Sequence, residues 1–215
     1  MTSAPDTADL LKIWIRGWAA SRGCTPPTAD GEGWRVEVNA PDQLRRHVFA
    51  GDCATLRERA DEVVEPAVWL KACMATEALR ARVPPRWTVR AEPSYFMRFE
   101  GTPPRAVELH GGYVASIEES GGLVRVRIHA ADGTPAADGR IALVGDSAIF
   151  DRIATDEGHR RRGLGAAVMG ALHAVARERG ATRGLLAATE AGHALYLGLG
   201  WTVQSPYASA VISPT

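Results

Sequence analysis

Apolar residues follow a helical period near the N-terminus and a strand period soon after it. Trp34, Val36 and Val38 alternate with polar residues, which predicts a strand, and Val48–Phe49 predicts a second, short strand. Before them, residues 8–20 place apolar side chains every three or four positions, which predicts one amphipathic helix. The apolar positions of this helix are Leu10, Leu11, Trp14, Ile15 and Trp18.

Helices and strands are expected to alternate through the rest of the first half. Asp52 is a candidate N-cap for a helix that ends near Val63. A short buried strand is expected at residues 68–70. The last two elements expected here are a helix at 74–82, which Pro84–Pro85 ends, and a strand at 87–99, interrupted at Pro93.

The pattern becomes clearer after residues 101–112, GTPPRAVELHGG, which form the candidate domain boundary. A stripe from Leu164 to Val175 predicts a long helix that Gly180 ends. Gly145–Asp146 suits a hairpin turn, and residues 132–139, DGTPAADG, are expected to form a polar loop. The other elements expected are strands at 113–118, 123–129, 140–144, 147–155, 184–188, 201–203 and 208–212, and a helix at 189–198. This order predicts an α/β fold, a mixed sheet with helices packed on it.

Charge and cysteine content narrow the possible functions. The chain has 25 basic and 25 acidic side chains, so a neutral total argues against a broad surface for nucleic acid or an anionic membrane. Cys24, Cys53 and Cys73 share no metal-ligand or CxxC spacing, and no metal site is expected. The N-terminus has no signal-peptide pattern, and no stretch reaches the roughly 20 apolar residues of a membrane span. We therefore expect reduced thiols and a soluble, cytoplasmic protein.

The densest chemical signal lies at residues 147–172, where a strand ends and HRRRGLG opens the long helix. Gly163 and Gly165 remove side chains where the amides of a first helical turn are unpaired, a setting that suits a phosphate. Arg160–Arg162 add charged donors beside it. A dinucleotide fingerprint would need glycine at Val168, and a P-loop would need a lysine that this segment lacks. The simpler alternative, that the glycines only permit close helix–sheet packing, stays open at this point.

The pattern Arg160-x-x-Gly163-x-Gly165 after a strand resembles the coenzyme A pyrophosphate loop of the GNAT acetyltransferases. The resemblance implies acetyl-CoA as the cofactor and an acyl-CoA N-acyltransferase fold over residues 106–215. Ile153 and Thr155 would then offer backbone groups to the pantetheine arm. The residues implied at the pyrophosphate are Arg160, Arg161, Arg162, Gly163, Leu164, Gly165 and Ala166.

A second segment strengthens this resemblance. HALYLGLGW at residues 193–201 is similar to the family's Ala-x-x-Leu-Tyr-x-x-x-Gly-Phe ending, with Gly192 in place of the usual Ala and Trp201 in place of Phe. Thr189 stands where many members carry an Asn. The two signatures are separated by about one helix, one strand and one helix. Together they are more specific than either signature alone.

The chain also departs from the family. The two helices that usually follow the first strand have no counterpart, because residues 120–122 are too short to hold them. Residues 1–105 are expected to form an N-terminal accessory half. Their order of helix, strand, helix and strand echoes the C-terminal half, so a degenerate partial GNAT repeat that supplies the missing wall is our hypothesis.

Two side chains are candidates for catalysis. Tyr196 stands at the family's tyrosine position and is the candidate acid, with a core tyrosine as the alternative. Asp151 is the candidate base, directly or through a water, and an ion pair with Arg152 or Arg127 is the alternative. Strand alternation would place Asp151 on one face with Ile149 and Ile153.

The remaining polar residues are ranked lower. His159 is expected to face solvent in a turn, and His173 to lie on the surface of the long helix. His193 could approach the acceptor, although a capping or surface position is favoured, and Glu118 and Glu119 could line the acceptor groove.

The resulting interpretation is an N-acetyltransferase that moves an acetyl group from acetyl-CoA to the amine of a small acceptor. The main alternative is a catalytically idle acyl-CoA-binding regulatory module. A nucleic-acid binder is disfavoured, because aromatic residues are not interleaved with the arginines. Sheet edges near 203–212 leave both a monomer and a homodimer open.

Overall fold

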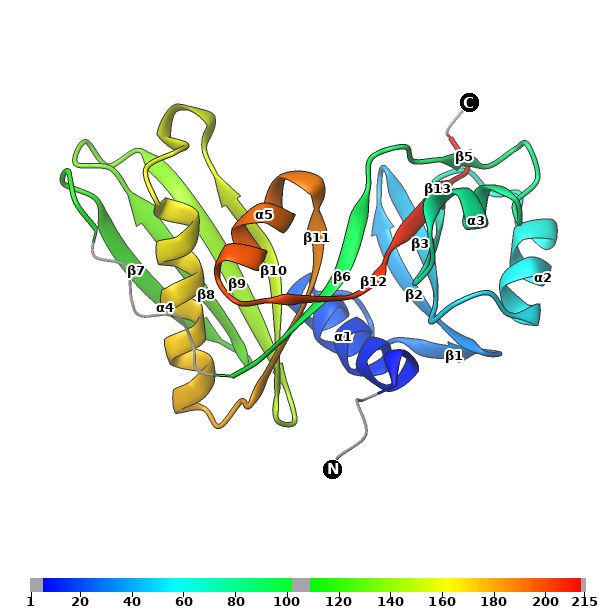
Figure 1. The fold of residues 1–215 in the computed structure, drawn as a ribbon, viewed down its shortest axis with the longest axis horizontal. Coiled ribbons are helices and arrows are strands. Elements are labelled where there is room, and N and C mark those ends of the chain that lie inside the picture. The colour runs from blue at the N-terminus through cyan, green and yellow to red at the C-terminus, as the bar shows by residue number, and fades with distance from the viewer. Residues whose placement is uncertain (1–5, 102–108, 214–215) are drawn as a thin grey trace. The chain divides into compact units, whose positions relative to one another are not determined.

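The computed structural model describes residues 6–101 and 109–213, which fall into two compact units (Figure 1). The first unit comprises Met1–Met97, Ala187–His193 and Val203–Thr215, and the second comprises Arg98–Leu186 and Ala194–Thr202. The chain therefore passes between units several times. Most of the expected boundary segment, 102–108, lies outside the described residues, so the division at residue 105 remains a prediction.

The first unit is built on a six-stranded sheet with the order β1-β2-β3-β4-β13-β5. β3 and β4 pair in parallel from Arg45↔Val68 to Phe49↔Ala72, and helix α2 connects them. β13 pairs antiparallel with both β4 and β5, so a C-terminal strand completes this sheet. The elements are α1 (Thr7–Ser21), β1 (Thr28–Asp30), β2 (Gly33–Ala40), β3 (Gln43–Phe49), α2 (Ala54–Glu62), β4 (Val68–Ala72), α3 (Thr76–Arg80), β5 (Thr88–Val89) and β13 (Ala208–Val211).

The predicted amphipathic helix is confirmed as α1, whose apolar stripe is buried. The ring of Trp14 packs edge-on against Phe96 and Tyr207, at centroid distances of 5.8 and 5.5 Å. The predicted helix at 74–82 is shorter, at Thr76–Arg80, and the strand expected at 87–99 is two separate strands, β5 and β6.

The predicted N-cap of α2 is wrong. The Cys53 thiol accepts a hydrogen bond from the backbone amide of Leu56 at 3.4 Å and caps the helix. The Asp52 carboxylate instead binds Arg57 and Arg82, each at 2.8 Å. Two nearby guanidinium groups are stronger partners for a carboxylate than a helix amide, which explains the exchange.

The second unit contains most of a seven-stranded sheet with the order β12-β6-β11-β10-β9-β8-β7. β7 to β10 form an antiparallel meander, and β11 lies parallel to β10 after the crossover helix α4. β6, β11, α5 and β12 have residues in both units. The elements are β6 (Ser94–Glu100), β7 (Val114–Ser120), β8 (Leu123–His129), β9 (Pro135–Val144), β10 (Ser147–Thr155), the 3-10 turn Glu157–His159, α4 (Leu164–Glu178), β11 (Arg183–Thr189), α5 (Glu190–Gly198) and β12 (Thr202–Pro206).

Helix α4 covers one face of this sheet at very close range. A Cβ on Gly139 would lie 2.5 Å from Ile153 Cδ1, 2.7 Å from Val168 Cγ1 and 3.3 Å from Leu172 Cδ1. Small residues are needed here because the helix approaches the strand backbone closely. The polar loop expected at 132–139 is therefore wrong from Pro135 onward, where β9 begins.

His173 is buried, contrary to the prediction that it lies on the helix surface. Its side chain is 4% exposed and lies among the rings of Phe99 and Phe150, at 4.6 Å from each, and Trp201, at 5.6 Å. Helix α4 therefore buries a second face against aromatic side chains, which the single predicted stripe does not include. Among the described residues, no helix combines the length and apolar character of a membrane span.

Candidate active site

Strand β10 contains an irregularity at the position of the candidate base. Asp151 pairs with Arg140, the next pair is Ala154 with Asp138, and Arg152 between them has a φ of 52°. Because the bulge inserts a residue, Asp151 and Ala154 both face away from α4. Ile153 lies instead beside the α4 residues, as its contact near Gly139 requires. The prediction that Asp151 and Ile153 share a face is therefore wrong.

Strand β10 pairs with β11 over its first residues. The register of this parallel pair runs from Ser147↔Arg183 to Ile149↔Leu185, whereas β10 continues to Thr155. Ile153 and Thr155, the residues predicted to meet pantetheine, lie in the later part of the strand. Their side chains are half-buried.

The turn after β10 has the backbone that the glycine motif requires. Arg161 has a φ of 63°, and Gly163 is the N-cap of α4 with a φ of 77°. The first three amides of this helix, those of Leu164, Gly165 and Ala166, precede its first bond, from Ala167 N to Gly163 O at 3.0 Å. They therefore point out of the helix end that carries a partial positive charge.

The two glycines of the motif differ in their surroundings. A Cβ on Gly163 would have no atom within 4 Å, so the space beside this residue is open. A Cβ on Gly165 would lie 3.1 Å from Leu195 Cδ2 and 3.7 Å from Thr155 Oγ1. The packing explanation considered above therefore accounts for Gly165 but not for Gly163.

Arg160, Arg161 and Arg162 are all exposed, and Arg162 takes part in a small polar cluster. Arg162 Nη1 donates to Tyr113 Oη at 2.8 Å, and Tyr113 Oη lies 2.9 Å from His159 Nδ1. His159 is thus half-buried and hydrogen-bonded rather than simply facing solvent. A cavity of about 410 Å³ lies beside this cluster, lined by Leu109, His110, Gly111, Tyr113, Arg162, Gly163 and Leu164.

Tyr113 and His110 line the cavity beside the glycine motif, and sequence reasoning did not select them. They precede the glycine motif by about fifty positions, and no local pattern marks them. The folding of the second unit brings them to the start of α4.

The two candidate catalytic side chains interact electrostatically. Tyr196 is 7% exposed, and burial together with the charge of Asp151 raises its pKa to about 12. The Asp151 side chain is 9% exposed, and its carboxylate lies 3.3 Å from Arg140 Nη2. The ion pair considered as an alternative role for Asp151 therefore exists, with Arg140 rather than Arg152 or Arg127 as partner.

The remaining polar residues considered from the sequence each have a partner of their own. Thr189, in the first unit, is exposed and its hydroxyl accepts the Gly192 amide at 3.4 Å. The ring of His193 stacks on Tyr95 at 4.0 Å. Glu118 pairs with Arg127, and Glu119 pairs with Arg179 at 2.5 Å.

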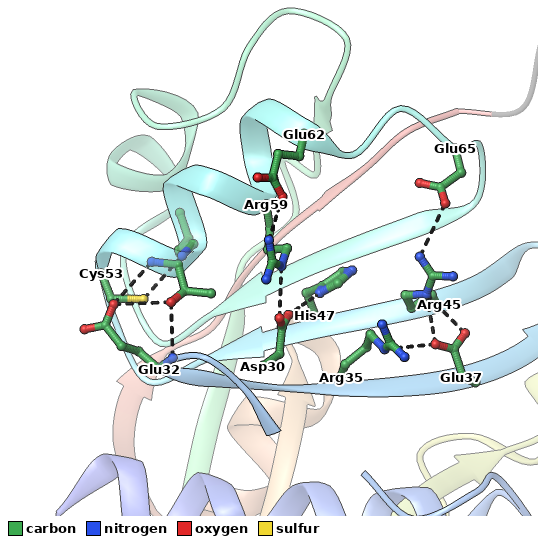
Figure 2. Close-up of polar contacts among 12 residues, drawn as sticks. Asp30, Glu32, Arg35, Glu37, Arg45, His47, Cys53, Arg59, Glu62 and Glu65 are labelled. Carbon is green, nitrogen blue, oxygen red and sulfur yellow. Dashed lines mark hydrogen bonds and ion pairs between the residues drawn. The ribbon is translucent and has the colours of Figure 1, made fainter. Parts of the chain in front are cut away.

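A separate buried polar cluster lies in the first unit (Figure 2). The His47 ring, 3% exposed, donates from Nδ1 to Asp30 at 2.6 Å, and Arg59 Nε donates to the other Asp30 oxygen at 2.9 Å. Burial lowers the pKa of His47 despite its neighbour Asp30, and burial also raises the pKa of the Cys53 thiol. His47 Nδ1 is engaged by Asp30, its Nε2 is buried, and the Cys53 thiol is protonated, so neither side chain is placed to act as a nucleophile. The cluster instead ties β1, β3 and α2 together.

Comparisons with known proteins support the family resemblance and the fold. Residues 111–203 match the sequence model of the acetyltransferase (GNAT) domain. No curated protein sequence matches the chain. The match lies within residues 106–215, the segment whose motifs resemble this family, and it supports that resemblance.

Solved structures extend the similarity of the fold to nearly the whole chain. A GCN5-related N-acetyltransferase from Kribbella flavida is 18% identical, with 99% of this chain and 98% of that chain covered at a TM-score of 0.68. A GNAT-family protein from Novosphingobium aromaticivorans is 18% identical, with coverages of 96% and 97% and a TM-score of 0.61. A tandem GNAT protein from the clavulanic acid biosynthesis pathway is 11% identical, with coverages of 98% and 96% and a TM-score of 0.56. The chain has the mixed α/β fold of these proteins.

Proposed function

Because residues 111–203 form a GNAT acetyltransferase domain, we propose that the protein transfers the acetyl group of acetyl-CoA to the amine of a small-molecule acceptor. One observation carries the proposal. A bulged strand presents Asp151 within electrostatic reach of a buried Tyr196, and the same strand leads into a glycine-capped helix start flanked by three arginines.

The residues at the start of α4 fit a pyrophosphate. The amides of Leu164, Gly165 and Ala166 would hold its oxygens, and the open space beside Gly163 leaves room for it. Arg160, Arg161 and Arg162 would add charge, and the backbone of Ile153 and Thr155 would bind the pantetheine arm. The cavity of about 410 Å³ beside Tyr113 would accept the remaining phosphate or the adenosine. Thr189, which belongs to the first unit, remains a candidate for cofactor binding from the sequence resemblance alone.

Acetyl-CoA, when bound, supplies an acyl group that is already activated as a thioester. Asp151 would accept a proton from the acceptor ammonium, directly or through a water, which makes the amine nucleophilic. Arg140 fixes the carboxylate on the face of the sheet opposite α4. The raised pKa of Tyr196 keeps its phenol protonated near neutral pH, so Oη holds a proton that can pass to the departing sulfur.

The first unit supports the hypothesis of a degenerate repeat. Its order β2-β3-α2-β4-α3-β5 parallels β9-β10-α4-β11-α5-β12, each with a parallel pair joined by a crossover helix. At the start of α2, however, Asp52 and Cys53 replace the arginine and glycine pattern. The Cys53 thiol accepts a hydrogen bond from the Leu56 amide, which a phosphate would otherwise use, so we expect one cofactor site per chain.

The alternative is a module that binds acyl-CoA without catalysis. Calorimetric titration with acetyl-CoA, combined with a turnover assay, distinguishes the acetyltransferase from this idle module. ADP is the ligand control in the titration. We expect micromolar binding at one site per chain, lost in Gly163→Trp, and release of free thiol when a suitable amine is added. No binding at millimolar acetyl-CoA would refute the proposal, and binding without turnover over a broad amine panel would favour the idle module.

A further inference from the structure

A second cavity of about 450 Å³ lies in the second unit, next to the candidate base. Its lining includes Arg125, Arg127 and His129 from β8, Asp138 from β9 and Ala154 from β10. Gly139 faces α4, so its neighbour Asp138 faces the opposite side of the sheet. Cross-strand partners share a face, and the pairing Arg127↔Asp138↔Ala154 therefore places these residues on the side away from α4.

Asp151 occupies the adjacent row on the same face. Across the strands this row reads Asp151, Arg140, Arg125 and Glu118, and the next row reads Ala154, Asp138, Arg127 and Ser116. On β8 and β9 the rows are two residues apart, a separation of about 7 Å along a strand. The cavity therefore reaches the row of Asp151 at Arg125 and extends along the next row.

The arginines of the cavity retain capacity to bind an anion. Arg125 Nη2 donates to Asp138 at 2.7 Å, and 39% of the Arg125 side chain remains exposed. Arg127 pairs with Glu118, whose side chain is 53% exposed on the edge strand β7. Exposed pairs of this kind contribute about 1 kcal/mol or less, so a carboxylate from a ligand can replace Glu118.

The acidic groups nearby are already engaged. Asp138 takes the Arg125 bond, and Asp156 Oδ1 accepts the Gly158 amide at 3.0 Å. His129 adds a third group that can donate to an oxygen. A second ammonium group in this cavity would meet two guanidinium groups and would compete with Arg125 for Asp138, so a carboxylate fits the arginines better than a polyamine does.

We propose that the acceptor is an amine that also carries a carboxylate, an inference that rests on the proposed acetyl transfer. The amine lies at Asp151 on β10, and the carboxylate binds Arg127 and Arg125 on β8, two strand spacings of about 4.8 Å each across the sheet. An extended dipeptide spans about 7 Å, whereas the two charged groups of an α-amino acid share one carbon. Dipeptide-sized amino acids are therefore the expected class.

The test compares an acid with its amide in a thiol-release assay. We expect glycylglycine to be acetylated with a kcat/KM at least about tenfold above that of glycylglycinamide, because a charge-assisted bond to arginine is lost in the amide. Glycine and spermidine should be poorer acceptors than glycylglycine. Arg127→Gln should raise KM for glycylglycine about tenfold and leave that for the amide unchanged.

Arg179→Gln is the matched control, because Arg179 also pairs with a glutamate of β7 but is the C-cap of α4, outside the cavity. It should change neither KM. Equal use of acid and amide, a preference for spermidine, or the same response to both variants would overturn the inference while leaving acetyl transfer intact.

Calorimetry with glycylglycine in the presence of CoA tests the cavity without turnover. Binding that Arg127→Gln weakens supports the assignment, and no binding to the wild type at millimolar peptide refutes it. Failure of the proposed function has a different signature, since acetyl-CoA itself would then not bind.

Discussion

Protonation of His173 should make the second unit less stable in mild acid. Burial lowers the pKa of this histidine to about 4 from its usual 6.5, and its Nε2 is buried without a partner in the described part of the chain. Because the folded pKa is lower, the unfolded chain binds the proton more readily. The stability contribution is therefore complete above pH 6.5 and is lost as pH falls toward 4.

The size of the loss follows from the two pKa values. Between pH 7.5 and pH 5 the unfolded histidine becomes protonated while the folded one stays neutral, which removes about 2 kcal/mol from the free energy of unfolding. His173→Leu is apolar and close in volume, so it should remove this dependence. The depressed pKa of His47 also lowers stability in acid, but that contribution is common to both proteins.

Urea unfolding followed by tryptophan fluorescence measures the effect. The fall in the free energy of unfolding from pH 7.5 to pH 5 should be about 2 kcal/mol smaller in His173→Leu than in the wild type. His110→Gln, at an exposed position, should behave as the wild type. An identical fall in wild type and His173→Leu would refute the reasoning, whatever the absolute stability of the variant.

Four further substitutions test the site and the packing. Tyr196→Phe should leave acetyl-CoA affinity unchanged and lower kcat about 100-fold or more, measured by thiol release; an unchanged kcat would remove its role as acid. Asp151→Asn should lower activity at neutral pH and recover part of it at alkaline pH, where the amine loses its proton unaided; a pH profile parallel to the wild type would contradict a base. Asp30→Asn should cost about 3 kcal/mol of unfolding free energy, because it breaks a buried pair with His47 and Arg59; a loss below 0.5 kcal/mol would show the cluster to be unimportant. Gly139→Ala should cost about 1–3 kcal/mol, whereas Gly198→Ala, whose Cβ meets no atom within 4 Å, should not; equal stabilities would deny the close approach of α4.

The elements that sequence predicted well are those with strong local patterns. Helices α1 and α4 each have a long apolar stripe, and β8 was predicted with the bounds it has in the structure, Leu123–His129. The turn between Arg160 and Gly165 was found because its chemistry is contained in six consecutive residues. Such features depend on neighbours in the chain, which a single sequence displays directly.

The features that sequence missed depend on strand pairing and packing between distant segments. β13 joins the sheet of the first unit, although about 120 residues separate its pairing partner Val89 from Ala210. The first residues of β9 have the composition of a loop because α4 leaves room only for small side chains there.

The bulge at Arg152 has the largest consequence for function. Simple alternation assigns Asp151 and Ile153 to one face, and the extra residue separates them. Asp151 is thereby placed opposite α4, in the row next to Arg127 and the cavity of about 450 Å³. A sequence can name the carboxylate, but the other groups that an acceptor would meet follow only from the register of β8, β9 and β10.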